Sequence, residues 1–281
     1  MSLSIPVQIY NFSQNLQQTY CLTYNQSKSD AGKFLALVAQ TLLQKILESD
    51  TPFHNWEHTI LVTLTGQAIL QGKQIEEGNV SSQDWLHLIF SLLCHDIGYV
   101  KGICQQDKPE SYIYATGKEN SRILLSSYST GASLNPYHVD RGKLFVEDYF
   151  QHYKCIDINT VQQHIERTRF PAPVSDNYSQ TTDYPGLARA ADLIGQLSDP
   201  QYLSKLPALF SEFTEAGINQ ILGYYHYQEL RQNLPQYYQK LILRHIQPAL
   251  HYLELTTVGQ KILKHLHDNL SMAQEEALSL I

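Results

Sequence analysis

Apolar residues recur at helical spacing through most of this chain, and runs that alternate between polar and apolar residues are scarce. Between residues 31 and 48 the apolar positions repeat every three or four residues, which is the pattern of one buried helix face. Similar stripes predict further helices at 56–70, 81–98, 118–127, 139–153, 159–167 and 184–196. The pattern therefore predicts an all-α fold with few strands.

The segments outside these stripes set the expected organisation. Residues 169–183 contain two prolines and many polar side chains, which predicts a long loop. Pro207, Pro235 and Pro248 punctuate the C-terminal third, and Pro248 is expected to kink or end its helix. We expect residues 1–28, which the pattern leaves unassigned, to precede a main domain at 29–200. Residues 201–281 should be a helical extension that packs on the same domain or forms a homodimer interface.

The composition narrows the class of protein. The 281 residues are 43% hydrophobic and 17% charged, which is typical of a globular chain rather than a disordered one. A net charge of -7 argues against binding to a nucleic-acid polymer, because that function needs a positive surface. The four cysteines form no C-x-x-C pair, the N-terminus has no signal-peptide pattern, and no apolar run is long enough for a membrane span. We therefore expect a soluble cytoplasmic protein with reduced thiols and no membrane partner.

Two short histidine motifs could carry chemistry. In Phe53-His54-Asn55-Trp56-Glu57-His58 the histidines are four residues apart, so on a helix they would share a face. In the second motif an apolar helix ends abruptly in His95-Asp96. Burying an imidazole beside a carboxylate is costly unless something pairs with both, and a divalent ion would do so. The alternative is that Asp96 caps the next segment and His95 forms a hydrogen bond in the core.

A third motif places Asp192 alone in a stretch of small and apolar residues, 187–194. Such a carboxylate suits a closely packed helix on which one acid faces a partner. The alternative is a solvated or ion-paired aspartate, with Arg189, three residues earlier, as a candidate partner.

Taken together, the order His58, His95-Asp96, Asp192 resembles the HD superfamily of metal-dependent phosphohydrolases. The resemblance covers roughly residues 50–200 and is closest to the cyclic-nucleotide phosphodiesterase branch, which opens with an aromatic-His-Asn-x-x-His motif. That branch also has a histidine at the start of a middle helix, as His138 is here. It usually carries another histidine three residues after the His-Asp aspartate, where this chain has Tyr99.

The resemblance implies an all-α bundle of several helices, with a metal site in a core cleft. His58, His95, Asp96 and Asp192 would bind a divalent ion, and Asp96 would bridge to a second one. His54 would protonate the leaving group and Asp96 would also take part in catalysis. The mixed donor set leaves Zn, Mn, Fe, Co, Ni and Mg open as the metal.

The implied reaction is hydrolysis of a phosphate ester or anhydride in a small molecule, with a nucleotide favoured, by a phosphodiesterase or nucleotidase. His138, Arg167 and Arg169 are candidates for binding the substrate phosphate, because a guanidinium matches phosphate oxygens. An alternative is a catalytically silent regulatory module that binds metal or nucleotide. A further alternative is a di-iron oxygenase that uses His138 and His164 as extra ligands.

Overall fold

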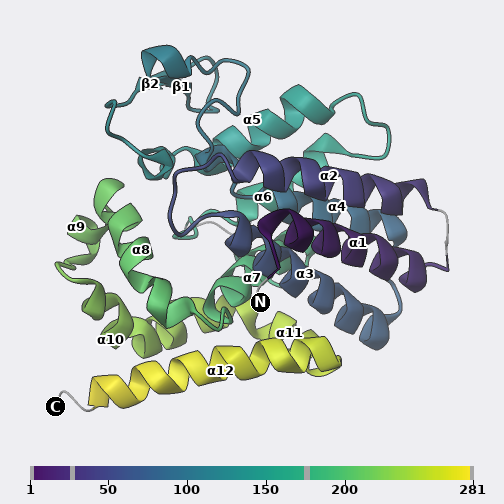
Figure 1. Cartoon of the computed structure of the whole chain (residues 1–281). Coiled ribbons are helices and arrows are strands. Elements are labelled where there is room, and N and C mark those ends of the chain that lie inside the picture. Colours follow the sequence, from purple (N-terminus) through teal and green to yellow (C-terminus); the bar gives the residue numbers. More distant parts are fainter. Residues whose placement is uncertain (1–2, 26–28, 174–177, 279–281) are drawn as a thin grey trace.

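The computed structural model describes residues 3–25, 29–173 and 178–278 of the chain. Its regular structure is almost entirely helical (Figure 1), which confirms the predicted all-α fold. The first part of the chain forms α1 (Ile5–Thr23), α2 (Asp30–Ile46), α3 (Trp56–Glu77), α4 (Ser82–Cys94), α5 (His138–Phe150), α6 (Ile158–Arg167) and α7 (Tyr184–Leu197). The rest forms α8 (Tyr202–Glu215), α9 (Ile218–Leu222), α10 (Tyr227–Tyr237), a π-helical segment (Tyr238–Ile242), α11 (Leu243–Glu254) and α12 (Thr257–Leu278).

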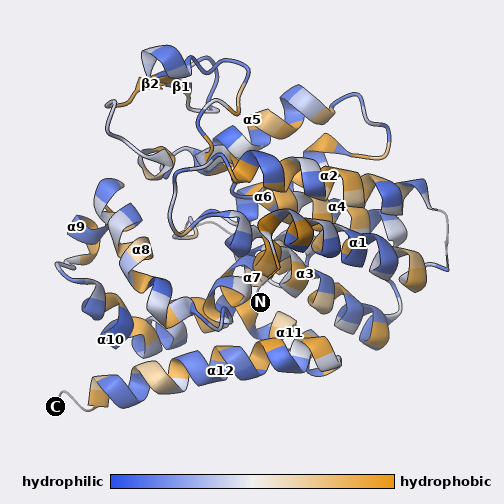
Figure 2. Cartoon of the chain, viewed as in Figure 1, coloured by the Kyte–Doolittle hydropathy of each residue, from blue (hydrophilic) through white to orange (hydrophobic). Residues whose placement is uncertain are grey.

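Helix α3 lies at the centre of the bundle and packs against α4, α7 and α11. Helices α1 and α2 form a hairpin that covers α4, and α5 and α6 pack beside α7. The hydrophobic residues of these helices face one another, as the orange faces in Figure 2 show. Because three helices enclose α3, side chains on its N-terminal turn are positioned by rigid neighbours.

Local sequence signals explain several helix ends. The Ser81 side chain accepts from the backbone of Asp84, whose carboxylate accepts in return, so a capping box starts α4. Helix α3 ends at Gly78 in the left-handed conformation. The sequence predicts an end near Gly72 instead, and this is wrong. Buried packing against α7 and α11 outweighs the cost of one glycine inside a helix.

Three other expectations are corrected. Residues 118–127 are not helical, because a short antiparallel hairpin of β1 (Ile113–Ala115) and β2 (Arg122–Leu124) runs through them. Gly117 and Glu119 adopt positive φ in the hairpin turn, which breaks a helical path. The unassigned N-terminal segment contains helix α1. Pro207, Pro235 and Pro248 lie inside helices α8, α10 and α11, where buried neighbours such as Leu206 and Ala249 keep the helices continuous.

The segment 169–183 lacks regular helix and strand in its described parts, as expected, and residues 174–177 lie outside the described residues. Helices α11 and α12 pack on α3 and α7, so the C-terminal part adjoins the bundle (Figure 1). Short 3-10 turns at η1 (Ile97–Tyr99), η2 (Pro109–Ser111) and η3 (Gly131–Leu134) complete the described structure. In the part of the chain that the structure describes, no helix is both long and apolar enough to cross a membrane.

Candidate metal centre

The first ligand candidate, His58, lies in the first turn of α3. Asn55 is the residue that positions it, because its side chain accepts hydrogen bonds from the backbone of Glu57 and His58 and so caps the helix. His54 therefore precedes the helix and does not share its face, contrary to the simple i, i+4 reading. Its ring nevertheless lies 5.4 Å from that of His58, centroid to centroid.

His95 and Asp96 lie where α4 ends and η1 begins. The Nδ1 atom of His95 lies 2.7 Å from the carbonyl oxygen of Leu92, so Nδ1–H donates there and Nε2 faces the other way, toward His58. Asp96 occupies the N-cap position of η1, but its side chain makes no capping hydrogen bond. The capping alternative for Asp96 is therefore wrong. The carboxylate is buried and available for another partner.

Asp192 reaches the same place from α7. Helices α7 and α3 approach each other closely one turn after Asp192, where a Cβ on Gly195 of α7 would lie 2.8 Å from the backbone of Val62 on α3. Arg189 donates to the carbonyl oxygens of Tyr178 and Gln180 instead of pairing with Asp192. The ion-pair alternative for Asp192 is thus wrong.

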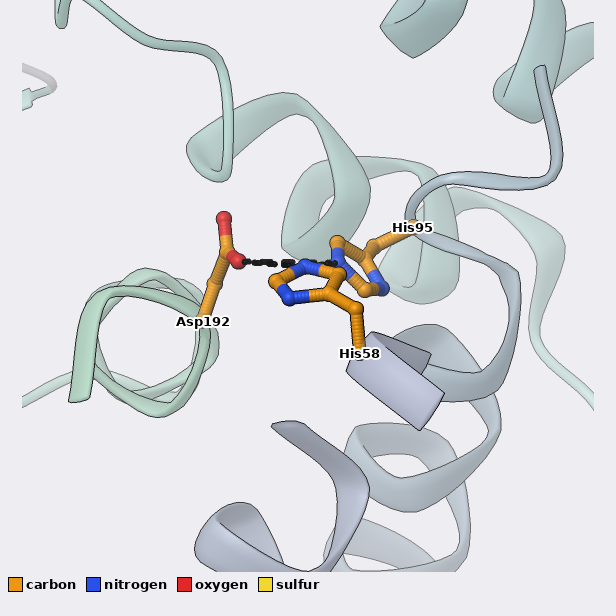
Figure 3. Close-up of side chains that lie close together, drawn as sticks. All are labelled: His58, His95 and Asp192. Atoms are coloured by element: carbon orange, nitrogen blue, oxygen red, sulfur yellow. Dashed lines mark hydrogen bonds and ion pairs between the residues drawn. The ribbon is translucent and has the colours of Figure 1, made fainter. Parts of the chain in front are cut away.

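Four ligand-type atoms converge between these helices. The Nε2 atoms of His58 and His95 are 3.3 Å apart. Asp96 Oδ2 is 3.2 Å from each of them, and Asp192 Oδ1 is 3.4 Å from His58 Nε2 and 3.5 Å from His95 Nε2. Figure 3 shows both imidazoles pointing toward the Asp192 carboxylate. The four side chains predicted as ligands therefore lie together, and their binding of a metal ion stays a prediction.

This spacing fits a shared ion. Ligand atoms about 2.0–2.2 Å from one ion are about 3.3–3.6 Å apart at tetrahedral angles. Asp96 Oδ2 is buried and has no hydrogen-bond partner among the described residues, although two imidazole nitrogens lie within ion-pair distance. The cluster of His58, His95 and Asp192 could hold a metal ion, and Asp96 lies beside it.

The electrostatics of the cluster favour positive charge at its centre. Burial disfavours the ionised form of Asp192, but the facing imidazoles lower its pKa to about 2. Burial likewise opposes a charge on His95, yet Asp96 and Asp192 raise its pKa well above the usual value. The two carboxylates thus stay ionised and attract a cation, and a bound metal takes the place of protons in such a set.

His54 lies beside the cluster and has a carboxylate partner that the sequence does not predict. Its Nδ1 atom forms a short contact with Glu212 on α8, and the other Glu212 oxygen accepts from the backbone nitrogens of Phe53 and His54. Burial opposes protonation of His54, but the charge of Glu212 outweighs it and raises the pKa to about 9. The imidazole is therefore protonated at neutral pH and its Nε2–H is turned away from Glu212.

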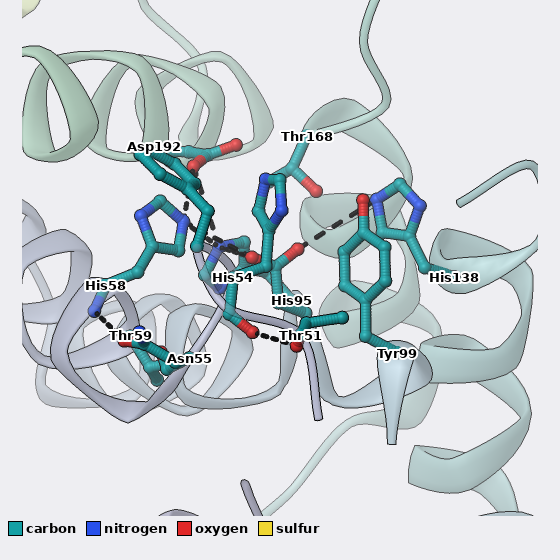
Figure 4. A network of polar contacts seen from close by, with 12 residues as sticks. Thr51, His54, Asn55, His58, Thr59, His95, Tyr99, His138, Thr168 and Asp192 are labelled. Carbon is teal, nitrogen blue, oxygen red and sulfur yellow. Dashed lines mark hydrogen bonds and ion pairs between the residues drawn. The ribbon is translucent and has the colours of Figure 1, made fainter. Parts of the chain in front are cut away.

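His138 begins α5 on the other side of Asp96, with its Nε2 3.9 Å from Asp96 Oδ1. Its Nδ1–H donates to the carbonyl oxygen of Asn135 over 2.6 Å. Burial lowers its pKa, so it is neutral with Nε2 as an acceptor. A Cβ on Gly98 would lie 1.9 Å from the His138 carbonyl oxygen, so only glycine permits this approach of η1 to α5. Tyr99 is stacked between His54 and His138 (Figure 4).

The arginines predicted to bind phosphate have partners within the chain. Arg167 donates to Asp183 and to the carbonyl oxygen of Gln180. Arg169 pairs with Glu166 and Asp140. Their phosphate-binding role stays a prediction. His164, considered as an extra ligand, lies 3.1 Å from the Ser91 hydroxyl, outside the cluster.

Sequence patterns miss two residues of this site. Glu212 lies 158 positions after His54, and no local motif marks it as a partner. Tyr99 follows the His-Asp motif closely, but a buried tyrosine is ordinary in a core of this kind. The sequence marks Tyr99 only as a departure from the resembling family, three residues after Asp96, and that signal predicts no role for it.

The comparisons place the sequence in a family. The model described as Npun_R2479-like matches residues 4–276, which include every residue of the centre. Among curated proteins no match is found. The chain therefore belongs to the Npun_R2479-like family.

Proposed function

We propose that this protein is a metal-dependent phosphohydrolase of the HD type. The observation that carries the proposal is the convergence of His58, His95 and Asp192 at ligand spacing, with the unbonded Asp96 oxygen among them. Structural clusters of buried charge normally contain their own counter-charges. Among the described residues, neither carboxylate of this cluster pairs with a lysine or arginine, and only imidazoles face them.

The centre would be formed by His58, His95, Asp96 and Asp192. Imidazole nitrogen and carboxylate oxygen together suit Zn, Mn, Fe, Co or Ni, and a more hydrated position beside Asp96 suits Mg or Mn. A divalent ion bound there lowers the pKa of a water molecule and draws charge from a phosphoryl oxygen. The Nδ1–H bond from His95 to the Leu92 carbonyl fixes the tautomer that leaves Nε2 free for the ion.

His54 is the proposed general acid. Hydrolysis of a phosphate ester breaks a P–O bond, and the departing alkoxide needs a proton. Glu212 holds His54 protonated and engages Nδ1, so the Nε2–H is the proton to be donated. The same glutamate bonds the backbone at Phe53 and His54, which fixes where the imidazole lies relative to the ligands. His54 would then regain its proton from solvent.

The proposed substrate is a small phosphorylated molecule, with a nucleotide favoured. The ligand residues are mostly buried, and the side chain of Asp192 is 18% exposed, so this degree of burial suits a small molecule better than a polymer. Phe170 and Tyr237 pack edge to face, with ring centroids 5.9 Å apart. Burial raises the pKa of Tyr237, and the charge of Asp192 adds a smaller contribution. An aromatic pair near Asp192 would suit a planar base.

The test is turnover of protein reconstituted with Mn²⁺, Zn²⁺, Fe²⁺ or Mg²⁺ on phosphomonoesters, cyclic nucleotides and nucleoside polyphosphates. Turnover that depends on the metal and is lost in Asp96→Ala supports the proposal. Asp148→Asn is a matched control, because Asp148 also has an unbonded carboxylate oxygen but lies near the end of α5. Metal binding with no turnover on any substrate would instead support a regulatory module.

A further inference from the structure

Tyr99 forms a three-ring stack with the two histidines that flank Asp96. Its ring lies 4.8 Å from that of His54 at an interplanar angle of 18°, and 4.4 Å from that of His138 at 12°. The residue is 2% exposed. Figure 4 shows the Tyr99 hydroxyl pointing in the same direction as the free edges of both imidazoles, toward the side on which Asp192 lies.

Stacking and burial alone do not require the hydroxyl, because a phenylalanine ring would stack and fill the space equally well. A buried phenol oxygen costs free energy unless it is hydrogen-bonded. Asn135 meets part of this need, since its Nδ2–H donates to the Tyr99 oxygen over 2.7 Å. The backbone carbonyl of Asn135 also fixes His138, so one residue positions two members of the stack.

The hydrogen bond from Asn135 leaves the O–H of Tyr99 unused as a donor. With its oxygen accepting from Asn135, Tyr99 still has an O–H to donate. Among the described residues, the side-chain hydrogen bond of Tyr99 is the one that it accepts from Asn135. A tyrosine phenol ordinarily has a pKa of about 10, so the proton remains on the oxygen at neutral pH.

The surroundings indicate what would accept it. The unused donor lies between His54, the proposed acid, and His138, whose Nε2 faces Asp96. An oxygen of a substrate phosphate held at the metal centre would be a strong, negatively charged acceptor. A neutral donor there adds a hydrogen bond to phosphate without adding a positive charge that would compete with the metal.

We propose that Tyr99 is a substrate-binding residue that donates its phenol proton to a phosphate oxygen, and that Asn135 positions it. This inference rests on the proposed function. It assigns a substrate contact to Tyr99, which lies just after the His95-Asp96 motif and is not one of its ligand residues.

The experiment measures binding of inorganic phosphate to the Mn²⁺-loaded full-length protein by titration calorimetry, with metal content and unfolding temperature recorded for each variant. Tyr99→Phe keeps the stack and removes only the hydroxyl, so phosphate binding should weaken about tenfold while the metal content is unchanged. Asn135→Leu keeps the hydroxyl but frees it, and should weaken binding by a smaller factor. Tyr20→Phe is the control, because Tyr20 is equally buried on α1 without a described side-chain hydrogen bond.

Phosphate binding by Tyr99→Phe as tight as that of the unaltered protein would overturn the inference. Loss of metal in Tyr99→Phe would also overturn it, because the effect would then run through the ligands. If the unaltered protein turns over phosphate esters while Tyr99→Phe binds phosphate normally, only the role of Tyr99 fails. If the unaltered protein neither turns over esters nor binds phosphate, both proposals fail.

Discussion

Two charged clusters, one between α3, α4 and α7 and the other between α5 and α6, deal with burial in opposite ways. The metal cluster consists of His58, His95, Asp96 and Asp192. The ion-pair network consists of Asp140, Lys143, Glu166 and Arg169, beside a hollow of about 520 Å³. Both contain two carboxylates, but their other members differ: imidazoles in the first, permanent cations in the second.

The ion-pair network neutralises itself. Lys143 and Arg169 each contact both Asp140 and Glu166, at distances between 2.5 and 3.0 Å. Burial would raise the pKa of Glu166, but hydrogen bonds from Arg169 and Lys143 lower it to about 2. Two cations and two anions thus balance within the chain. This arrangement needs no further ion, because Lys143 and Arg169 already pair with both carboxylates.

The metal cluster has no permanent cation of its own. In the described structure the ion-pair partners of Asp96 and Asp192 are all histidines, whose protons a bound metal would replace. The difference teaches that the number of charged residues is a poor guide to a metal site. The decisive feature is whether the acceptor atoms converge without donors of their own.

Removing a carboxylate of the metal cluster should have the largest effect of any single substitution considered. Asp192→Asn should lower turnover by about a thousandfold or more, because it removes a ligand and exceeds the 10–100-fold effects of outer partners. Steady-state kinetics on the best substrate of the panel measures this. Asp148→Asn should stay close to the unaltered protein. Full turnover in Asp192→Asn would contradict the assignment of ligands.

His164 is buried outside both clusters and pairs with no carboxylate among the described residues, so the pH dependence of stability shows chiefly what burial does to a histidine. Burial lowers the pKa of His164 to about 4, below its ordinary value of 6.5. As pH falls below 6.5 the unfolded chain binds a proton that the folded chain rejects, so stability is lost between about pH 6.5 and 4, by an amount on the order of 3 kcal/mol. Urea unfolding at several pH values measures the loss. His164→Asn keeps a donor for Ser91 and should lose less stability over this range; an identical loss would refute the assignment.

Removing the charge of Glu212 tests whether His54 acts with the metal cluster. Glu212→Gln should lower kcat by about 10–100-fold, since the histidine loses the carboxylate that holds it protonated, while metal content stays the same. Glu215→Gln is the matched control, because Glu215 lies on the same helix but bonds Thr130 and Ser133. Equal kcat values for the two variants would remove His54 from the proposed mechanism.

The smallest expected effect concerns the self-neutralised network. Glu166→Gln should destabilise the fold by about 1 kcal/mol, because its carboxylate is partly exposed and such pairs contribute little. Thermal unfolding should therefore shift by only a few degrees, and metal content should not change. A loss of metal in this variant would show that the two clusters are coupled.

The sequence is informative about the fold where burial is continuous. The apolar patterns of α2, α4 and α7 predict helices at nearly their observed positions, because α2 buries one wide face and α4 and α7 are buried nearly all round. The window at 118–127 fails, since local turns at Gly117 and Glu119 override its weak pattern. Pro207 and Pro248 mislead because tertiary packing maintains their helices.

The sequence is informative about the metal cluster for a different reason. His58, His95 and Asp96 lie in short motifs, so neighbouring residues in the sequence are enough to suggest them as metal ligands. Glu212 and the tyrosine stack depend on contacts between distant helices and on the close approach at Gly98, which no spacing rule predicts. Ligand types can be read from motifs, but the partners that orient them require the fold.

The central claim is that the four converging residues bind a metal ion, and metal content tests it most directly. The full-length protein, purified without chelator, should contain about one equivalent or more of a divalent transition metal by mass spectrometry, since such sets bind these ions well. Asp192→Asn should lose most of that metal, and Glu166→Gln should keep it. No metal in the unaltered protein, even after incubation with Mn²⁺ or Zn²⁺, would contradict the account.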